Sequence, residues 1–181
     1  MDIKLNLGCF NKKIYGFQNL DIRPEVNPDI IDDAFTLTTI KNNTISLIYS
    51  SHMMEHKNRK DGLNAFNRFY EVLIDRGELY LSVPDLERVF EHYIFFKDLR
   101  KLQCFLYGSQ NYQEDYHLNG WDFKTIKEDL ESVGFKNIKK FNRWEIDWLA
   151  GIDDYSAAYL EPEFNRKEGH LMSLNIRCQK K

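Results

Sequence analysis

The sequence predicts an α/β protein with a mainly parallel, doubly wound β-sheet. Short apolar stretches of strand character alternate along the chain with longer segments of helical periodicity, a pattern typical of parallel sheets. Five consecutive strand candidates are followed by small or polar residues, as expected where the carboxyl ends of parallel strands meet at one edge. At 181 residues, the chain is expected to fold as one domain over residues 1–181.

The first five strands are expected in short apolar stretches. These cover residues 3–7, 17–22, 29–31, 45–49 and 78–83. Only about ten residues separate the first two strands, whereas a crossover with its helix needs roughly 10–12 residues or more. The first crossover helix is therefore predicted to be reduced to a turn or absent.

Two helices are expected from apolar residues at helical spacing and from the signals at their ends. One covers residues 59–75 and stops at the Arg76-Gly77 pair. The other starts after Asp122, which can accept hydrogen bonds at a helix N-terminus, and ends at Gly134, which suits the C-terminal turn.

The second half of the chain is less regular in pattern. An aromatic-rich helix is expected over residues 86–106, with Phe90, Ile94 and Leu102 among its buried positions. Closing strands are expected at residues 136–141 and 173–178. Residues 142–170 carry no pattern that predicts regular structure, and a substrate lid, an interface and an ordered loop are all compatible with them.

Composition argues against several classes of protein. Hydrophobic residues make up 43% of the chain and aromatic residues 14%, which argues against disorder. A net charge of −3 and a pI near 6.0 give no electrostatic reason to expect a nucleic-acid partner. The three cysteines form no CxxC pair, and no cluster of histidine, cysteine and acidic residues has ligand spacing in the sequence, so we expect neither disulfides nor a metal.

A cytoplasmic location is expected. No apolar run approaches the roughly 20 residues of a membrane-spanning helix. The chain enters its first strand directly from Met1, so no signal peptide is expected. The scattered cysteines suit a reducing compartment.

The turn after the first strand and the end of the second strand are the most informative pair. Gly8 lets backbone N–H groups approach a ligand closely, and Asp21 can accept hydrogen bonds from both hydroxyls of a ribose. Alone, Gly8 also fits a plain tight turn, and Asp21 also fits a solvated acid. Together they indicate a nucleoside site. Dinucleotide-binding loops carry three glycines where this chain has one, which argues against a nicotinamide dehydrogenase.

Five motifs at successive strand ends resemble one family of enzymes. Leu-Asn-Leu-Gly-Cys is followed by Asn-Leu-Asp-Ile, Asp-Ala, Tyr-Ser-Ser-His-Met-Met-Glu-His and Leu-Ser-Val-Pro-Asp, between residues 3 and 85. In this order they are similar to class I S-adenosylmethionine-dependent methyltransferases, and among these to the small type-11-like branch, whose first crossover helix is short or absent. The resemblance implies a Rossmann-like sheet with an antiparallel C-terminal strand. It also implies S-adenosylmethionine as cofactor and S-adenosylhomocysteine as product.

The resemblance also implies roles at the cofactor. The turn formed by Gly8, Cys9 and Phe10 would face its methionine part, with Phe10 standing where the family generally has a second glycine. Asp21 would bind the ribose hydroxyls. The positions expected at the adenine are Ile22, Asp33 and Ala34. Those expected at the sulfonium are Ser50, Ser51 and His52. Asp32 is an alternative to Asp33.

Methyl transfer needs few protein groups. Because a sulfonium is already an activated electrophile, the protein has mainly to align the acceptor, and only a protonated acceptor also needs a base. The candidates for the base are His52, His56 and His117, with Glu55 and Asp85 behind them. Local capping by Glu55 and His56, and a structural role of His117, are equally compatible with the sequence.

The leading hypothesis is methyl transfer to the oxygen of a small-molecule or glycan acceptor, such as a sugar-linked hydroxyl. This acceptor class rests on fold-level analogy and on the acidic and aromatic character of the chain. A nucleobase or a protein side chain is the alternative acceptor. A further alternative, motivated by Phe10 and the scarce glycines, is a module that binds S-adenosylmethionine or S-adenosylhomocysteine without turnover.

Overall fold

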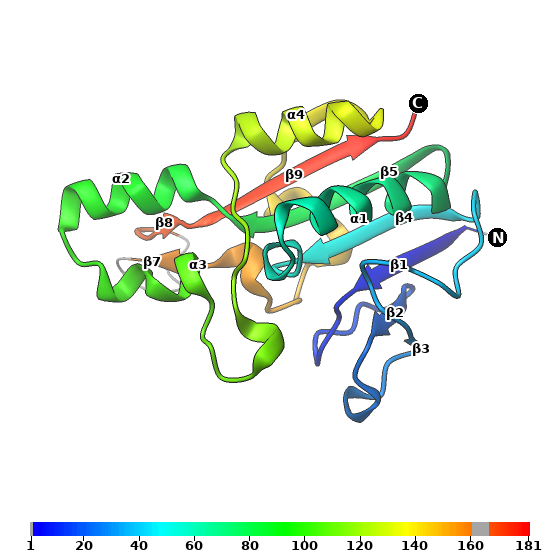
Figure 1. Ribbon diagram of the computed structural model, residues 1–181, viewed down its shortest axis with the longest axis horizontal. Coiled ribbons are helices and arrows are strands. Elements are labelled where there is room, and N and C mark those ends of the chain that lie inside the picture. Colours follow the sequence, from blue (N-terminus) through cyan, green and yellow to red (C-terminus); the bar gives the residue numbers. More distant parts are fainter. Residues whose placement is uncertain (1, 161–166) are drawn as a thin grey trace.

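A seven-stranded β-sheet with the order β3-β2-β1-β4-β5-β9-β6 lies at the centre of the molecule (Figure 1). The computed structural model describes residues 2–160 and 167–181. Neighbouring strands among β1–β5 run parallel, whereas β9 is antiparallel to both β5 and β6. The predicted mainly parallel sheet with an antiparallel C-terminal strand is thus confirmed. The strands are β1 (Ile3–Leu7), β2 (Gln18–Asp21), β3 (Ile30–Ile31), β4 (Ile45–Ser51), β5 (Leu73–Pro84), β6 (Lys136–Lys140) and β9 (Ser173–Gln179).

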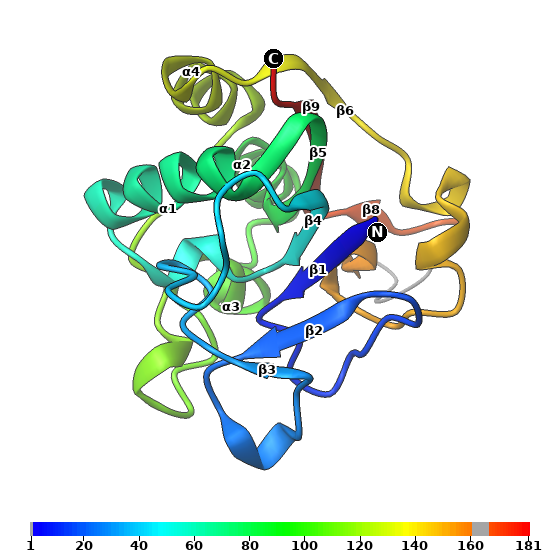
Figure 2. The same cartoon turned by 90° about the vertical axis from the view of Figure 1, so that its right-hand side faces the viewer.

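Two α-helices, α1 (Arg59–Val72) and α4 (Phe123–Val133), lie over the same face of the sheet (Figures 1 and 2). Each turns an apolar stripe inward. Phe66 and Phe69 of α1 and Leu130 of α4 are fully buried, and they share one hydrophobic core with the central strands. Burial of such side chains stabilises the fold by about 1.5–3 kcal/mol each.

The end signals of α4 act as predicted. The Asp122 side chain accepts a hydrogen bond from the Thr125 backbone N–H at 2.7 Å, and Gly134 ends the helix in the left-handed conformation. By contrast, α1 ends at Val72 rather than at residue 75, because Leu73 already pairs with β4. None of the helices in the described residues is long and apolar enough to cross a membrane.

The opposite face of the sheet is covered by residues 142–158 (Figure 2). This segment contains short 3-10 turns, and Trp148 packs its ring on Phe17, Tyr49 and Tyr80 with centroid distances of 5.0 to 5.4 Å. Part of the stretch without a predicted pattern therefore forms the second layer on the sheet. Its elements are η5 (Arg143–Glu145), η6 (Asp147–Leu149), η7 (Tyr155–Ala157), β7 (Tyr159–Leu160) and β8 (His170–Leu171), while residues 161–166 of that stretch lie outside the described residues.

The first three crossovers of the sheet contain no α-helix in the residues that the structure describes. The β1–β2 connection is a series of turns, and the β2–β3 connection contains one short 3-10 turn, η1 (Pro24–Val26). The predicted loss of the first crossover helix is confirmed, and the loss extends to the next two crossovers. Loops rather than helices therefore support the β2–β3 edge of the sheet.

The helix expected over residues 86–106 is broken. The chain takes a left-handed turn at Lys97, with φ of 56°, and continues as a 3-10 turn and a short helix. Leu102 is buried as expected, but Phe90 and Ile94 are 56% and 67% exposed. This segment projects beyond the carboxyl end of β5 (Figure 1). Val89 is buried against the rest of the protein, whereas the side of the helix that carries Phe90 and Ile94 is exposed. The elements are α2 (Leu86–Phe96), η3 (Arg100–Leu102) and α3 (Gln103–Tyr107).

Candidate functional site

The carboxyl ends of β1, β2, β4 and β5 meet at one edge of the sheet, where most of the predicted site residues lie. Gly8 follows β1, Asp21 ends β2, Ser51 ends β4 and Asp85 follows β5. Because Leu7 pairs with both β2 and β4, the ends of the three strands are level. The strand order therefore assembles the candidate site from segments that are far apart in the sequence.

The turn after β1 requires glycine at its first position. Gly8 has a φ of +61°, and a Cβ atom built there would lie 3.0 Å from the Sδ atom of Met53. The next residue, Cys9, is buried, and its backbone N–H donates to the Leu20 carbonyl at 3.0 Å. Burial raises the pKa of the Cys9 thiol to about 11, which suits a packing residue rather than a nucleophile.

The carboxylate of Asp21 is tied to this turn and to a neighbouring arginine. The Phe10 backbone N–H donates to its Oδ2 atom at 2.8 Å, and the backbone N–H and Nε of Arg23 donate to its Oδ1 atom at 3.0 and 3.1 Å. Burial alone would raise the pKa of Asp21, but the hydrogen bonds from Arg23 and Phe10 outweigh burial and hold the pKa below its usual value. Asp21 is therefore a charged acceptor at the strand end.

Arg23 is a site residue that sequence reasoning missed. Its guanidinium carbon lies 4.8 Å from the ring centroid of Phe10 and 5.7 Å from that of Tyr112. The Phe10 ring is thus turned toward Arg23 and is 46% exposed. An arginine two residues after the acid is visible in the sequence, but nothing there indicates that it folds back on Asp21.

The two neighbouring acids after β3 have different surroundings. The Asp32 carboxylate accepts hydrogen bonds from the side chain of Thr38, from the backbone and side chain of Thr39 and from the Asp33 backbone, at 2.7 to 2.9 Å. It therefore fixes its own loop. Asp33 is only partly buried, and its carboxylate accepts from a backbone N–H at 2.9 Å. Nearby, Ile22 is 58% exposed and Ala34 is buried.

His52 directly follows β4 in a left-handed backbone conformation, with φ of 48°. Its Nε2 atom lies 2.8 Å from the Ser173 hydroxyl oxygen, and that hydroxyl donates to the Tyr155 carbonyl at 2.5 Å. Because the carbonyl can only accept, the single hydroxyl proton is used there, so Nε2 must be the donor to Ser173. A neutral His52 therefore presents an electron pair at Nδ1.

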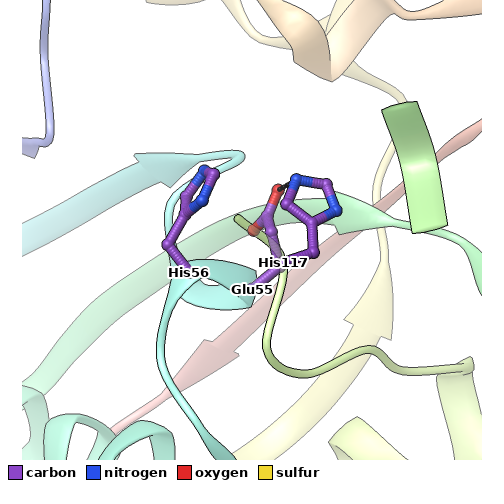
Figure 3. A group of neighbouring side chains, drawn as sticks. All are labelled: Glu55, His56 and His117. Carbon is purple, nitrogen blue, oxygen red and sulfur yellow. Dashed lines mark ion pairs between the residues drawn. The ribbon is translucent and has the colours of Figure 1, made fainter. Parts of the chain in front are cut away.

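That electron pair faces Glu55, a fully buried acid in the 3-10 turn η2 (Met54–His56). Glu55 Oε1 lies 3.3 Å from Nδ1 of His52 and 3.9 Å from Nε2 of His117, and neither carboxylate oxygen has a hydrogen-bond partner among the described residues. Burial raises the pKa of Glu55 to about 8 and lowers the pKa of His52 to about 3. Figure 3 shows Glu55 together with His56 and His117.

The other two candidate histidines are held by backbone carbonyls. His56 Nδ1 lies 3.2 Å from the Tyr116 carbonyl, and His117 Nδ1 lies 3.0 Å from the Phe105 carbonyl. Burial lowers the pKa of both imidazoles, with hydrogen bonds to the backbone offsetting part of the effect. The structure therefore gathers His52, His56 and His117 around Glu55.

Two other predicted residues make no hydrogen bond or ion pair with this group among the described contacts. Asp85 caps α2, where it accepts a hydrogen bond from the Arg88 backbone N–H at 3.4 Å, and burial raises its pKa. Ser50 is buried, and its hydroxyl has no hydrogen-bond partner within the described part of the chain. The sequence offered no signal for the meeting of Glu55 and His117, because a long stretch of chain separates them.

Solved structures with a similar fold include several methyltransferases. An S-adenosylmethionine-dependent methyltransferase from Archaeoglobus fulgidus matches with a TM-score of 0.60 and 16% identity, over 99% of this chain and 86% of that chain. A possible histamine N-methyltransferase from Thermotoga maritima matches with a TM-score of 0.61 and 11% identity, over 100% of this chain and 83% of the other.

A third similar structure carries the cofactor. Phosphoethanolamine N-methyltransferase 2 from Haemonchus contortus, in complex with S-adenosyl-L-methionine, matches with a TM-score of 0.53 and 16% identity, over 99% of this chain and 49% of that chain. No protein-family model matches the chain, and no curated protein matches its sequence. At these identities the likeness shows the fold alone, and this chain shares the Rossmann-like fold of these methyltransferases.

Proposed function

We propose that the protein binds S-adenosylmethionine at the carboxyl edge of its sheet and transfers the methyl group to the oxygen of a small-molecule or glycan acceptor. The observation that carries the proposal is the link between the turn after β1 and the acid that ends β2. Gly8 adopts a positive φ and leaves room for the Met53 side chain, and the Phe10 N–H of the same turn donates to Asp21. A glycine turn beside a carboxylate at a strand end supports a site for a ribose and its attached amino-acid part.

The residues at this edge would each bind one part of the cofactor, but the carboxylate proposed for the ribose is already engaged. Asp21 would accept from the ribose hydroxyls, with Ile22 exposed toward the adenine and Asp33 within the next loop. Arg23 and Phe10 now occupy the acceptor positions of the Asp21 carboxylate, which offers about four. Ribose binding therefore requires the Arg23 side chain to move away.

The chain's own groups would supply alignment and proton transfer. When bound, S-adenosylmethionine would supply an activated methyl group, with a C–O bond formed to the acceptor, the C–S bond broken and S-adenosylhomocysteine as the leaving product. Holding the acceptor in line is worth up to roughly 7–11 kcal/mol of barrier. The hydroxyl proton passes to a base, for which His52, His56 and His117 are the candidates.

A polar hollow supports an acceptor with several hydroxyl or acidic groups. It lies beside the end of β5, and its lining includes Asp85, Arg88, Lys140 and Ser173. Ser173 also touches His52, so the hollow adjoins the cluster around Glu55. Apolar side chains, Phe141, Leu171 and Leu174, line the same hollow, and this mixture of charged and apolar groups suits a sugar or sugar acid.

Calorimetry with S-adenosylhomocysteine, and with NAD for comparison, tests the cofactor. We expect S-adenosylhomocysteine to bind the wild type, NAD not to bind, and Asp21→Ala to weaken binding at least about tenfold, because a charge-assisted hydrogen bond is worth about 1.5–3 kcal/mol. Asp75→Ala, which removes an exposed acid elsewhere, should leave binding unchanged. Equal binding by Asp21→Ala and the wild type would contradict the proposal.

Turnover distinguishes an enzyme from an inert binding module. With methyl-labelled S-adenosylmethionine and a panel of sugars, sugar phosphates and hydroxylated small molecules, we expect label in a product that carries a methyl ether. Binding of the cofactor without label transfer to any acceptor class, including nucleic acid and protein, would favour the module. Label on nitrogen would overturn the choice of oxygen.

A further inference from the structure

We propose that Glu55, His56 and His117 bind a divalent transition-metal cation of the zinc class. Their ligand atoms, one from each side chain, all lie within 4.8 Å of one another. Figure 3 shows the carboxylate and the two imidazoles directed into the same space, from the turn after β4 and from the loop that precedes α4. This inference goes beyond the proposed methyl transfer and does not depend on it. With a metal bound, His56 and His117 would not be available as the base.

The carboxylate at the centre of the cluster lacks ordinary partners. Glu55 is 0% exposed, and neither of its oxygens accepts a hydrogen bond from the described residues. Within the described part of the chain, its ion-pair partners are histidines, His52 and His117, rather than lysine or arginine. A buried carboxyl group without partners either keeps its proton or binds a cation, and a metal bound here would displace that proton.

Both histidines are oriented as metal ligands usually are. The Nδ1 atoms of His56 and His117 face the carbonyls of Tyr116 and Phe105, at 3.2 and 3.0 Å. Because a carbonyl only accepts, each Nδ1 carries the proton, and a neutral ring then has its electron pair on Nε2. A backbone carbonyl that holds the second ring nitrogen in this way is the common outer partner of metal-bound histidine.

The electron pairs of the cluster converge on the same space. His52 presents Nδ1 toward Glu55 Oε1 at 3.3 Å, because its Nε2 donates to Ser173. His117 presents Nε2 toward the same oxygen at 3.9 Å. One proton on Glu55 can satisfy only one of these electron pairs, whereas a dication can accept several at once.

The loop that carries His117 is attached to the turn that carries Glu55. The Glu55 carbonyl accepts hydrogen bonds from the backbone N–H groups of Leu118 at 2.8 Å and Asn119 at 3.2 Å, and the His117 N–H donates to the Tyr107 carbonyl. The ligands are therefore held in place by backbone contacts that do not involve a metal. Such preorganisation reduces the entropic cost of binding.

The donor set selects the kind of metal. Two imidazole nitrogens and one carboxylate suit zinc and its first-row neighbours, whereas calcium and magnesium prefer oxygen ligands. Bonds of about 2.0–2.2 Å place neighbouring ligand atoms roughly 3.0–3.5 Å apart. A small inward movement of the imidazoles would thus bring all three ligand atoms to bonding distance of one metal ion. A fourth coordination position would remain for His52 or water.

Zinc titration of the chelator-treated full chain tests the site. Calorimetry with Zn²⁺ alone is expected to give one equivalent per chain with a micromolar or tighter dissociation constant. Because loss of an outer partner of a metal ligand already costs roughly 10–100-fold, loss of a ligand in Glu55→Gln or His117→Gln should weaken binding by at least about 100-fold. The matched control is His170→Gln, since His170 is an exposed histidine outside the cluster, and it should bind as the wild type does.

Several outcomes would overturn the site. These are no stoichiometric zinc binding by the wild type, unchanged binding in both cluster variants, or equal loss in His170→Gln. If Glu55→Gln does not fold, as judged by circular dichroism, His56→Gln at the partly exposed ligand replaces it. S-adenosylhomocysteine binding is measured separately in the presence of chelator, so failure of the metal site and failure of the cofactor site remain distinct.

Discussion

Asp21 is the residue on which the proposed cofactor site depends, and its carboxylate is already engaged. Arg23 donates to both of its oxygens, and the Phe10 N–H donates to one of them. The acid at the strand end could be predicted from the sequence, because strand ends are where α/β sheets bind ligands. The Arg23 contact could not, because it depends on how the chain turns after the strand.

Removal of Arg23 is expected to help the cofactor. Arg23→Ala frees the Asp21 carboxylate for the ribose hydroxyls, and a partly exposed ion pair contributes about 0.2–1 kcal/mol. At about 1.4 kcal/mol per tenfold change, we therefore expect S-adenosylhomocysteine to bind up to about fivefold more tightly by calorimetry. Arg59→Ala, at an exposed position on α1, should bind as the wild type does. Weaker binding by Arg23→Ala would mean that Arg23 contributes to the site.

Gly8 and Gly16 provide a matched test of the turn after β1. Both have positive φ, of +61° and +81°, but a Cβ at Gly8 would meet Met53 at 3.0 Å while a Cβ at Gly16 has nothing within 4 Å. Both alanine variants carry the backbone cost, and Gly8→Ala adds overpacking. Urea unfolding is expected to show a loss about 1–3 kcal/mol larger for Gly8→Ala. Equal losses of unfolding free energy in the two variants would show that the Met53 side chain moves aside at no measurable cost.

At the scale of elements, side-chain hydrogen bonds replace the missing crossover helices. Asn19 accepts from the Ile14 backbone and from Asn6, at 2.8 and 3.0 Å, and thereby fixes the first crossover. Arg68 of α1 donates to the carbonyls of residues in the third crossover, Thr36, Leu37 and Ile40. The absence of the first crossover helix could be predicted from the short distance between the first two strands in the sequence. The hydrogen bonds of Asn19 and Arg68 could not, because they join residues that are distant in the sequence.

Asp32 should make the stability of the β3–β4 loop depend on pH. Burial alone would raise its pKa, but hydrogen bonds from Thr39 and Thr38 hold the pKa below its usual value. A lowered folded-state pKa stabilises the protein above the unfolded value of about 3.9, and this contribution is lost as pH falls through the folded-state pKa. We expect Asp32→Asn to cost about 1–3 kcal/mol at pH 7 and progressively less below pH 4.

Unfolding free energies of the wild type and Asp32→Asn between pH 7 and 3 check this prediction. Asp75→Asn, which changes an exposed acid, should differ little from the wild type over the whole range. A constant difference between Asp32→Asn and the wild type across that range would show that the charge of Asp32 does not contribute.

The broken helix beyond β5 shows what periodicity cannot resolve. Apolar and aromatic residues surround the segment on several sides, so helical spacing alone does not tell which of them face the protein. Val89 and Leu102 do, whereas Phe90 and Ile94 do not. Which residues are buried depends on the elements that pack beside the segment in the tertiary structure, and helical spacing in the sequence does not specify these.

At the scale of the whole molecule, the strand order brings the candidate site together. The alternation of strands and helices predicts a parallel sheet, and a parallel sheet places Gly8, Asp21 and Ser50 at one edge. The layer formed by residues 142–158 could not be predicted, because Trp148 packs there on residues from three other segments. The cluster of Glu55 with His117 likewise arises only when distant loops meet.

A crystal structure of the protein with S-adenosylhomocysteine tests the proposed cofactor site most directly. The proposal predicts the ribose hydroxyls on the Asp21 carboxylate, the amino-acid part along the turn at Gly8, and the Arg23 side chain displaced from Asp21. A ligand bound elsewhere, with the pair of Asp21 and Arg23 intact, would contradict it.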